Sequence, residues 1–209
     1  MPLREKTRKI STVCSSRAGK LTLHYKRVQF TNRLRSEVAE LDVFGHGVRP
    51  MSDKAEALDP YEYHIAIENH VYPHHITEKL PDAFLGYTVP FYHGAPNAAD
   101  YFPKESFVAI DFEDYERTRD IIRSTIANDE YQDRLPYIIE ARRRVLEEHN
   151  LFALLEREID RRHEASSGLE PHGVIMNRPT FRMRRPLAGV RGAAEKVITK
   201  TKHKLGWHP

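Results

Sequence analysis

The sequence of 209 residues predicts an α/β protein in which helices flank a parallel sheet. Short apolar runs alternate with longer segments of helical periodicity, in the order strand–helix–strand–strand–helix–strand. A polar cluster also follows directly after one of the predicted strands. Because ligands bind at the carboxyl ends of strands in open α/β sheets, this cluster predicts a binding site at one edge of the sheet.

The first half of the chain supplies the predicted sheet. A helix is predicted over residues 23–38, because Phe30, Leu34 and Val38 form one apolar stripe. A helical turn is expected around residues 54–58. The predicted strands cover residues 9–14, 41–44, 63–67, 88–92 and 107–110. Strands in this order, separated by helical segments, are typical of a parallel sheet.

The second half is predicted to be helical and then basic. Pro136 is expected in the first turn of a helix, where proline is tolerated. The predicted helical segments are residues 114–127, 137–149 and 151–159, and we expect them to pack on the sheet. A linker is expected over residues 166–186, with a short basic helix over residues 193–205. The domain is therefore predicted to span residues 1–164, with a basic tail over 165–209.

Composition indicates a chain that can form a hydrophobic core and argues against a membrane-spanning protein. Hydrophobic residues make up 40% of the chain, enough for a core, and no run approaches the length of a membrane span. The first ten residues lack the apolar core of a signal peptide. Cys14 is the single cysteine, which favours a reducing, cytoplasmic location and a role as a buried small side chain.

The basic tail has two interpretations. Residues 161–209 hold 11 Lys and Arg against 3 Asp and Glu. Such a segment is usually solvated. Its last part, however, places Val197, Ile198, Leu205 and Trp207 among lysines, a pattern that also suits peripheral contact with an anionic membrane surface. No nucleic acid partner is expected.

The polar cluster predicts a site for an anionic ligand such as a nucleotide diphosphate. Glu68 and Asn69 follow the predicted strand 63–67, and Thr77 stands where a helix N-cap would stand, ahead of Glu78 and Lys79. Several alternatives stay open: Lys79 is a phosphate ligand or a surface cation, Glu78 contacts hydroxyl groups or favours the helix start, and Glu68 contacts the ligand or braces the loop.

Arg27 lies in the first turns of the predicted helix 23–38 and is the second candidate phosphate ligand, because guanidinium and ammonium groups both stabilise a diphosphate. His70, His74 and His75 match no recurrent zinc spacing, so no metal site is predicted. Tyr92, Tyr101 and Phe102 are interpreted as residues that shape turns.

Four blocks of residues, in order and at compatible spacing, carry a resemblance to a known family. The blocks are Ile67-Glu68-Asn69, Ile76-Thr77-Glu78-Lys79, Val89-Pro90-x-Tyr92-x-Gly94-x-Pro96, and Tyr101-Phe102-Pro103 with Ser106-Phe107. The chain over residues 10–150 resembles the donor-binding C-terminal domain of the α-1,3/4-fucosyltransferases, glycosyltransferase family 10. The resemblance implies a Rossmann-like domain, one lobe of a GT-B enzyme, that binds GDP-fucose.

The resemblance also implies roles for single residues. Arg27, in the run Arg27-Val28-Gln29-Phe30, and Lys79, at the end of Thr-Glu-Lys, would neutralise the diphosphate and so carry the catalytic role. Donor binding would fall to Glu68, Asn69, His75, Thr77 and Glu78. His75 departs from the family, in which an aromatic residue is common. No cofactor or metal is implied.

The resemblance implies inverting transfer of fucose to a glycan hydroxyl. In the family the general base belongs to an acceptor lobe that precedes the donor lobe, whereas this chain begins almost at the first predicted strand. We therefore expect a partner chain to supply the acceptor lobe and its base. The alternative is a non-catalytic or truncated lobe that binds a nucleotide sugar. The sequence leaves the acceptor, the linkage and the oligomeric state undetermined.

Overall fold

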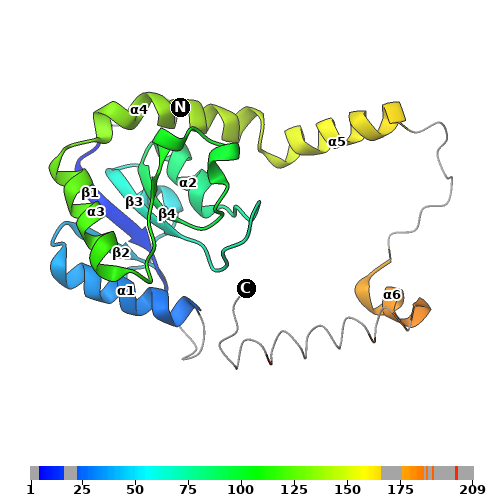
Figure 1. The fold of residues 1–209 in the computed structure, drawn as a ribbon, viewed down its shortest axis with the longest axis horizontal. Coiled ribbons are helices and arrows are strands. Elements are labelled where there is room, and N and C mark those ends of the chain that lie inside the picture. Colours follow the sequence, from blue (N-terminus) through cyan, green and yellow to red (C-terminus); the bar gives the residue numbers. More distant parts are fainter. Residues whose placement is uncertain are drawn as a thin grey trace. The chain divides into compact units, whose positions relative to one another are not determined.

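The computed structural model describes residues 5–16, 23–165 and 176–185, together with Leu187, Val190 and Thr201. The chain forms two compact units, Met1–Ile159 and Asp160–Pro209. Figure 1 shows the course of the chain, with the sheet and its flanking helices in the first unit. The boundary falls inside helix α5 (Leu151–Ala165), slightly before the limit at residue 164 that the composition suggests.

The first unit is built on a sheet of five parallel strands in the order β2-β1-β3-β4-β5. The strands are β1 (Arg8–Val13), β2 (Leu41–Phe44), β3 (Tyr61–Ile67), β4 (Val89–His93) and β5 (Val108–Ala109). This arrangement confirms the predicted α/β class. Because every strand runs in the same direction, the carboxyl ends of all of them lie along one edge of the sheet.

Helices cover both faces of the sheet (Figure 1). The α-helices of the first unit are α1 (Leu23–Glu37), α2 (Lys79–Leu85), α3 (Tyr115–Ala127) and α4 (Tyr131–Glu147), and the first part of α5 also belongs to it. Short 3-10 helices are η1 (Lys54–Ala57), η2 (Ala98–Asp100) and η3 (Lys104–Ser106). In the strand order, β2 lies on one side of β1, whereas β4 lies on the opposite side of β3. Right-handed crossovers therefore place α1, between β1 and β2, and α2, between β3 and β4, on opposite faces of the sheet.

Each of these two helices has a partner. On the face of α1, the ring of Phe30 contacts the rings of Phe112 and Tyr115, so α1 and α3 lie side by side. On the face of α2, α4 packs against α2. Each helix therefore buries its apolar side against both the sheet and a neighbouring helix, which is the main source of its stability.

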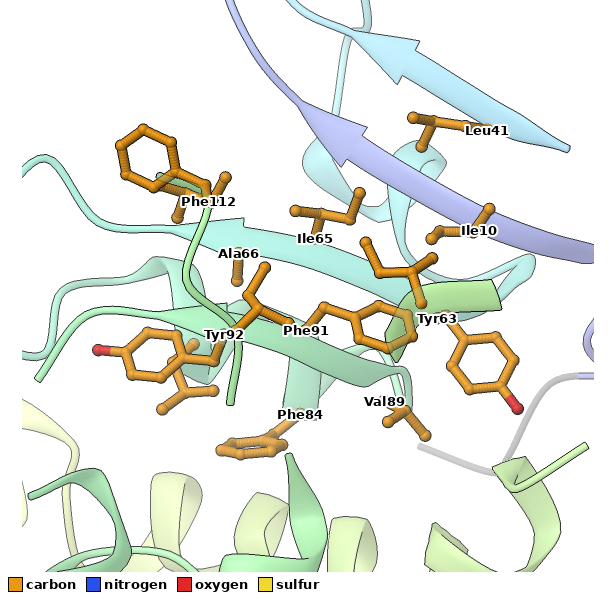
Figure 2. Packing of buried hydrophobic residues seen from close by; sticks show 14 of the residues in the cluster. Ile10, Leu41, Tyr63, Ile65, Ala66, Phe84, Val89, Phe91, Tyr92 and Phe112 are labelled. Atoms are coloured by element: carbon orange, nitrogen blue, oxygen red, sulfur yellow. The ribbon is translucent and has the colours of Figure 1, made fainter. Parts of the chain in front are cut away.

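The core lies on both faces of the sheet, so residues 63–67 of β3 are all buried. Tyr63, Ile65 and Ile67 of β3 are buried, and the Tyr63 ring stacks on Phe91 of β4 with centroids 5.7 Å apart. Figure 2 shows Tyr63, Ile65 and Phe91 together with Phe84, which α2 (Lys79–Leu85) contributes. The predicted stripe of α1, which includes Leu34, is also buried. Each such side chain contributes roughly 1.5–3 kcal/mol of transfer free energy.

A buried histidine pins η1 to the sheet. The hydroxyl of Ser11 donates to the carbonyl of Ala57, and its oxygen lies 2.8 Å from Nδ1 of His64. Because the hydroxyl proton is already used, Nδ1 must carry the proton and donate to Ser11. Burial, assisted by the nearby charge of Lys54, lowers the pKa of His64 to about 3. The imidazole is therefore neutral over the physiological range.

Helix α4 corrects the prediction for Pro136. The helix begins at Tyr131, so Pro136 lies inside it and not in its first turn. Proline has no N–H, and the bond to the carbonyl of Gln132 is lost. The helix continues because Tyr131, Ile138 and Ala141 are buried against the rest of the domain. Burial of these side chains thus outweighs the preference of proline for the first turn of a helix.

Two further predictions about the C-terminal half are wrong. Helix α5 was expected to pack on the sheet, yet Phe152 is 82% exposed and Ile159 62% exposed. In the second unit, the segment predicted as a linker contains helix α6 (Arg178–Arg184), which the side chain of Asn177 caps by accepting from the Thr180 amide at 3.0 Å. Apart from Thr201, the predicted basic helix 193–205 lies outside the described residues.

Candidate functional site

The candidate site lies at the carboxyl end of β3. Ile67 is the last residue of this strand, and Glu68 and Asn69 follow it. Side chains alternate between the two faces of an extended chain, so Glu68 points to the opposite face from Ile67 and Asn69. The three residues can therefore contact α1 on one side and the start of α2 on the other.

Arg27 of α1 reaches this strand end from its own face. One guanidinium nitrogen, NH1, donates to the carbonyl of Ile67 and to Oδ1 of Asn69, both at 3.1 Å. NH2 lies 2.8 Å from Nδ1 of His24. The buried Nε has no hydrogen-bond partner in the part of the chain that the structure describes. The strand end thus fixes the guanidinium in place, while one of its donors stays unused.

Glu68 is buried and bonded within the protein. Its side chain is 0% exposed. Oε1 accepts from the backbone N–H of Thr77 at 2.8 Å, and Oε2 accepts from the hydroxyl of Thr77 at 2.6 Å. A third partner is Lys79, whose Nζ lies 3.3 Å from Oε2. Of the two roles that the sequence left open for Glu68, this geometry supports bracing of the loop.

The same bonds correct the prediction for Thr77. Helix α2 begins at Lys79, its N-cap is Glu78, and no side chain caps it. Thr77 does not cap the helix because both its backbone N–H and its hydroxyl are directed to the carboxylate of Glu68. A buried carboxylate needs hydrogen-bond donors more than an accessible helix end does. Since Glu68 is close to Thr77 only in the folded chain, the sequence pattern could not reveal this competition.

Lys79 stands between a buried and an exposed partner. Nζ donates to Oγ1 of Thr77 at 3.0 Å and to Oε1 of Glu78 at 3.3 Å. The Glu78 side chain is 56% exposed, so an anion can approach the ammonium from that side. Partial burial raises the pKa of Glu78, but its own backbone N–H and the charge of Lys79 outweigh this effect, and the pKa lies below its usual range.

Histidines and aromatic rings form the loop between Asn69 and Thr77. The ring of His75 lies 6.3 Å from that of His70 and 6.4 Å from that of Tyr72. His74 has a left-handed φ of 64°, and its backbone N–H donates to Oδ1 of Asn97 at 2.8 Å. Within the described ranges, no group of three or more His, Cys, Asp or Glu side chains is placed to hold a metal ion.

The sequence pattern did not point to two residues beside the site, Asn97 and His24. Asn97 ties the loop to η2 through His74, and Nδ1 of His74 also lies 2.6 Å from the hydroxyl of Tyr101. His24 was missed as the neighbour of Arg27, although its position three residues earlier on the same helix is a usable signal. No local pattern connects Asn97 to His74, because the contact depends on the tertiary fold.

Gly94 allows β4 to approach Glu68 closely. A Cβ atom at this position would collide with the hydroxyl oxygen of Tyr92 and lie 2.6 Å from Cγ of Glu68. The same hydroxyl accepts from the backbone N–H of Ala95 at 3.0 Å. The turn after β4 is therefore shaped around the buried carboxylate, which confirms that Tyr92 shapes a turn.

A cavity of about 310 Å³ lies elsewhere, between α1 and the start of α3. Its charged side chains are already paired, Lys26 with Glu113 at 2.6 Å and Arg33 with Glu116. Neither Arg27 nor Lys79 lines it. At the strand-end site, direct contacts form two groups, Arg27 with Asn69 and Glu68 with Thr77, Lys79 and Glu78, which the chain itself joins at Glu68 and Asn69. The seventh predicted residue, His75, lies in the loop between Asn69 and Thr77, where its ring neighbours those of His70 and Tyr72.

The family profile described as glycosyltransferase family 10 (fucosyltransferase), C-terminal, matches residues 3–134. This chain belongs to glycosyltransferase family 10. The match covers the whole sheet and both segments that carry Arg27 and Lys79. The family resemblance seen in the sequence is thereby confirmed.

Curated relatives are fucosyltransferases from bacteria and mammals. The chain is 32% identical over 83 residues to an alpha-(1,3)-fucosyltransferase of Helicobacter pylori, a match that covers 39% of this chain and 17% of the relative. It is 31% identical over 117 residues to a 3-galactosyl-N-acetylglucosaminide 4-alpha-L-fucosyltransferase of Bos taurus, covering 53% and 31%. The chain thus spans less than a third of the length of these relatives.

Solved structures agree with the fold. A crystal structure of an alpha1,3-fucosyltransferase with GDP-fucose superimposes with a TM-score of 0.51 at 26% identity, covering 62% of this chain and 38% of that one. A structure of alpha1,3-fucosyltransferase with GDP gives the same TM-score of 0.51 at 28% identity, over the same shares of both chains. Both of these related crystal structures were determined with a guanine nucleotide, GDP-fucose in one and GDP in the other.

Proposed function

We propose that this chain binds GDP-fucose at the carboxyl end of β3 and provides the donor side of an inverting fucosyl transfer to a glycan hydroxyl. The observation that carries the proposal is the placement of two cations on one strand end. Arg27 is bonded to Ile67 and Asn69, and Lys79 to Thr77 and Glu68. The GDP-fucose complex of the related enzyme supports the same ligand.

The two cations suit the chemistry of the leaving group. In an inverting transfer the acceptor hydroxyl attacks the anomeric carbon while the bond to GDP breaks, and negative charge develops on the diphosphate. Preorganised cations that face this charge stabilise the transition state more than the ground state. Arg27 offers a fixed planar fork, and Lys79 a compact charge beside the exposed Glu78. Asn69, His75 and Glu78 are proposed to orient the ribose or the sugar.

The proton of the acceptor needs a base, which we assign to an acceptor lobe that is not part of the matched donor segment. Glu68 is unsuited to this task, because both of its carboxylate oxygens already accept hydrogen bonds from Thr77. A partner chain with an acceptor lobe would complete the enzyme. The second proposal is a lobe that binds a nucleotide sugar without transferring it.

Titration calorimetry with GDP, GDP-fucose and UDP tests donor binding directly. GDP and GDP-fucose are expected to bind the full chain, and UDP to bind more weakly. Absence of heat with both guanine ligands would contradict the proposal. Incubation with GDP-fucose and a panel of glycans then separates the two candidates: fucosylated product from the chain alone means that its own residues include the base, whereas donor binding without product favours the partnered or non-catalytic lobe.

We also propose that the basic tail contacts anionic membranes. Phe181, Met183 and Leu187 are exposed, at 40%, 83% and 85%, and basic residues such as Arg184 lie among them. No described helix has the length and apolarity needed to cross a bilayer. Residues 160–209 are expected to sediment with anionic liposomes at low salt and to be released at high salt. Equal binding to neutral liposomes would contradict an electrostatic attachment.

A further inference from the structure

Glu68 is the most deeply buried acidic group of the site. Its contacts are with the protein and do not favour direct contact with the donor. The side chain is 0% exposed, and its two oxygens are occupied by the N–H and the hydroxyl of Thr77. Burying a carboxylate is costly unless it is paired and hydrogen-bonded. Thr77 supplies the hydrogen bonds that Glu68 requires, and the ammonium of Lys79, which the proposed function needs, supplies the opposite charge.

We propose that Glu68 is a positioning residue that holds Lys79 in place for the diphosphate through Thr77, without contacting the ligand. The connection has two parts. Oε2 of Glu68 lies 3.3 Å from Nζ of Lys79, and the hydroxyl that donates to Oε2 accepts from the same Nζ at 3.0 Å. The inference rests on the proposed binding of GDP-fucose and adds the group that orients its cation.

The hydroxyl of Thr77 has one orientation in this arrangement. Its proton is given to Glu68, so its lone pairs face the ammonium of Lys79. Glu68 thereby fixes two contacts of Lys79 at the buried side, and only the contact with the exposed Glu78 remains to be exchanged for a phosphate oxygen. A lysine side chain held in this way loses less conformational entropy when it binds a ligand than a free one does.

The proposal can be tested by whether removal of the Glu68 charge raises or lowers the affinity for an anionic ligand. Glu68→Gln keeps the shape of the side chain and removes one negative charge. If Glu68 were merely a charge near the phosphates, its removal would strengthen the binding of an anionic ligand. If it positions Lys79, removal weakens binding, because the amide presents a donor to Thr77 and the ammonium loses its fixed partner. The two interpretations therefore predict opposite changes in affinity.

The experiment measures the binding of GDP by calorimetry and of guanosine by ligand-observed NMR, with the full chain. Glu68→Gln is expected to weaken GDP binding about tenfold and to leave guanosine binding unchanged, since the lost contacts serve the diphosphate. Adding Lys79→Ala to Glu68→Gln is expected to cost less affinity than Lys79→Ala alone, because the two residues act as a unit. Glu62→Gln is the matched control: it breaks a Glu–Lys pair of 2.7 Å with Lys9 on the same strand, at the opposite end.

Three results would overturn the inference. GDP affinity that is unchanged or higher in Glu68→Gln rules out positioning, and strictly additive effects of the two substitutions show that Glu68 does not act through Lys79. Equal losses for GDP and guanosine show a general structural role. Failure of the parent chain to bind GDP is a different outcome, because it removes the proposed function itself.

Discussion

Replacing Lys79 by alanine is expected to weaken GDP binding by about ten- to a hundredfold. A hydrogen bond to a charged group contributes on the order of 1.5–3 kcal/mol, and each 1.4 kcal/mol corresponds to about a factor of ten in affinity. The side chain of Lys79 is 22% exposed, so the contact is only partly screened by water. Its loss also leaves the buried charge of Glu68 without its cation, which adds to the unfavourable effect on an anionic ligand.

Lys54→Ala is the matched control for this prediction. Lys54 forms its pair with Asp82 at 2.7 Å, and its Nζ lies 3.9 Å from Oε1 of Glu78, just outside the strand-end site. Its side chain is 49% exposed, and its removal is expected to change GDP affinity little. Titration calorimetry of both variants at one ionic strength provides the comparison. GDP affinity of Lys79→Ala equal to that of the parent would show that the site is assigned to the wrong residues.

Acid is expected to destabilise the domain through His64. The pKa of this side chain is lowered to about 3 in the folded chain, chiefly by burial, against an ordinary value near 6.5. Between these values the unfolded chain binds a proton that the folded chain does not, so the free energy of unfolding falls as pH falls. The loss amounts to roughly 1.4 kcal/mol for each pH unit below 6.5. Above that pH the contribution of His64 is constant.

Thermal unfolding of the parent and of His64→Asn between pH 7 and pH 4 measures this effect. Asparagine carries an amide N–H close to the position of Nδ1, so it can still donate to Ser11, and it does not titrate in this range. The variant is expected to be less stable at pH 7 and to lose less stability on acidification. Carboxylates titrate in both proteins, so the difference between the two pH profiles isolates His64. Parallel profiles would contradict the assignment.

Local sequence patterns were sufficient to predict most of the helices and strands. The predicted strand 41–44 coincides with β2, and the predicted helix 114–127 differs from α3 by one residue at its start, where Asp114 caps the helix by accepting from the amide of Arg117. Strand alternation, helical periodicity and N-cap side chains act over a few residues, so the sequence displays them directly. The exposure of Phe152 on α5 was not predictable, because an apolar stripe on a helix does not show which other segment, if any, packs against it.

The candidate site shows the same division. Positions at strand and helix ends, together with the family blocks, predicted Arg27, Glu68 and Lys79 as members of one anion site. The same positions left a surface role for Lys79 and bracing of the loop by Glu68 open. The contacts among them were not readable from the sequence. Arg27 bonds to Ile67, forty positions away, and Glu68 to Thr77 across a loop of histidines and aromatic residues.

The sequence by itself determined the parallel α/β class, the family and the set of polar residues at the end of β3. The tertiary structure alone decided that Glu68 is buried, that Thr77 serves this carboxylate and does not cap α2, and that α4 runs through Pro136. The physical reason is the range of the forces involved. Backbone preferences are set by neighbours in the chain, whereas the cost of burying a charge or exposing an apolar side chain depends on which distant segments fold against it.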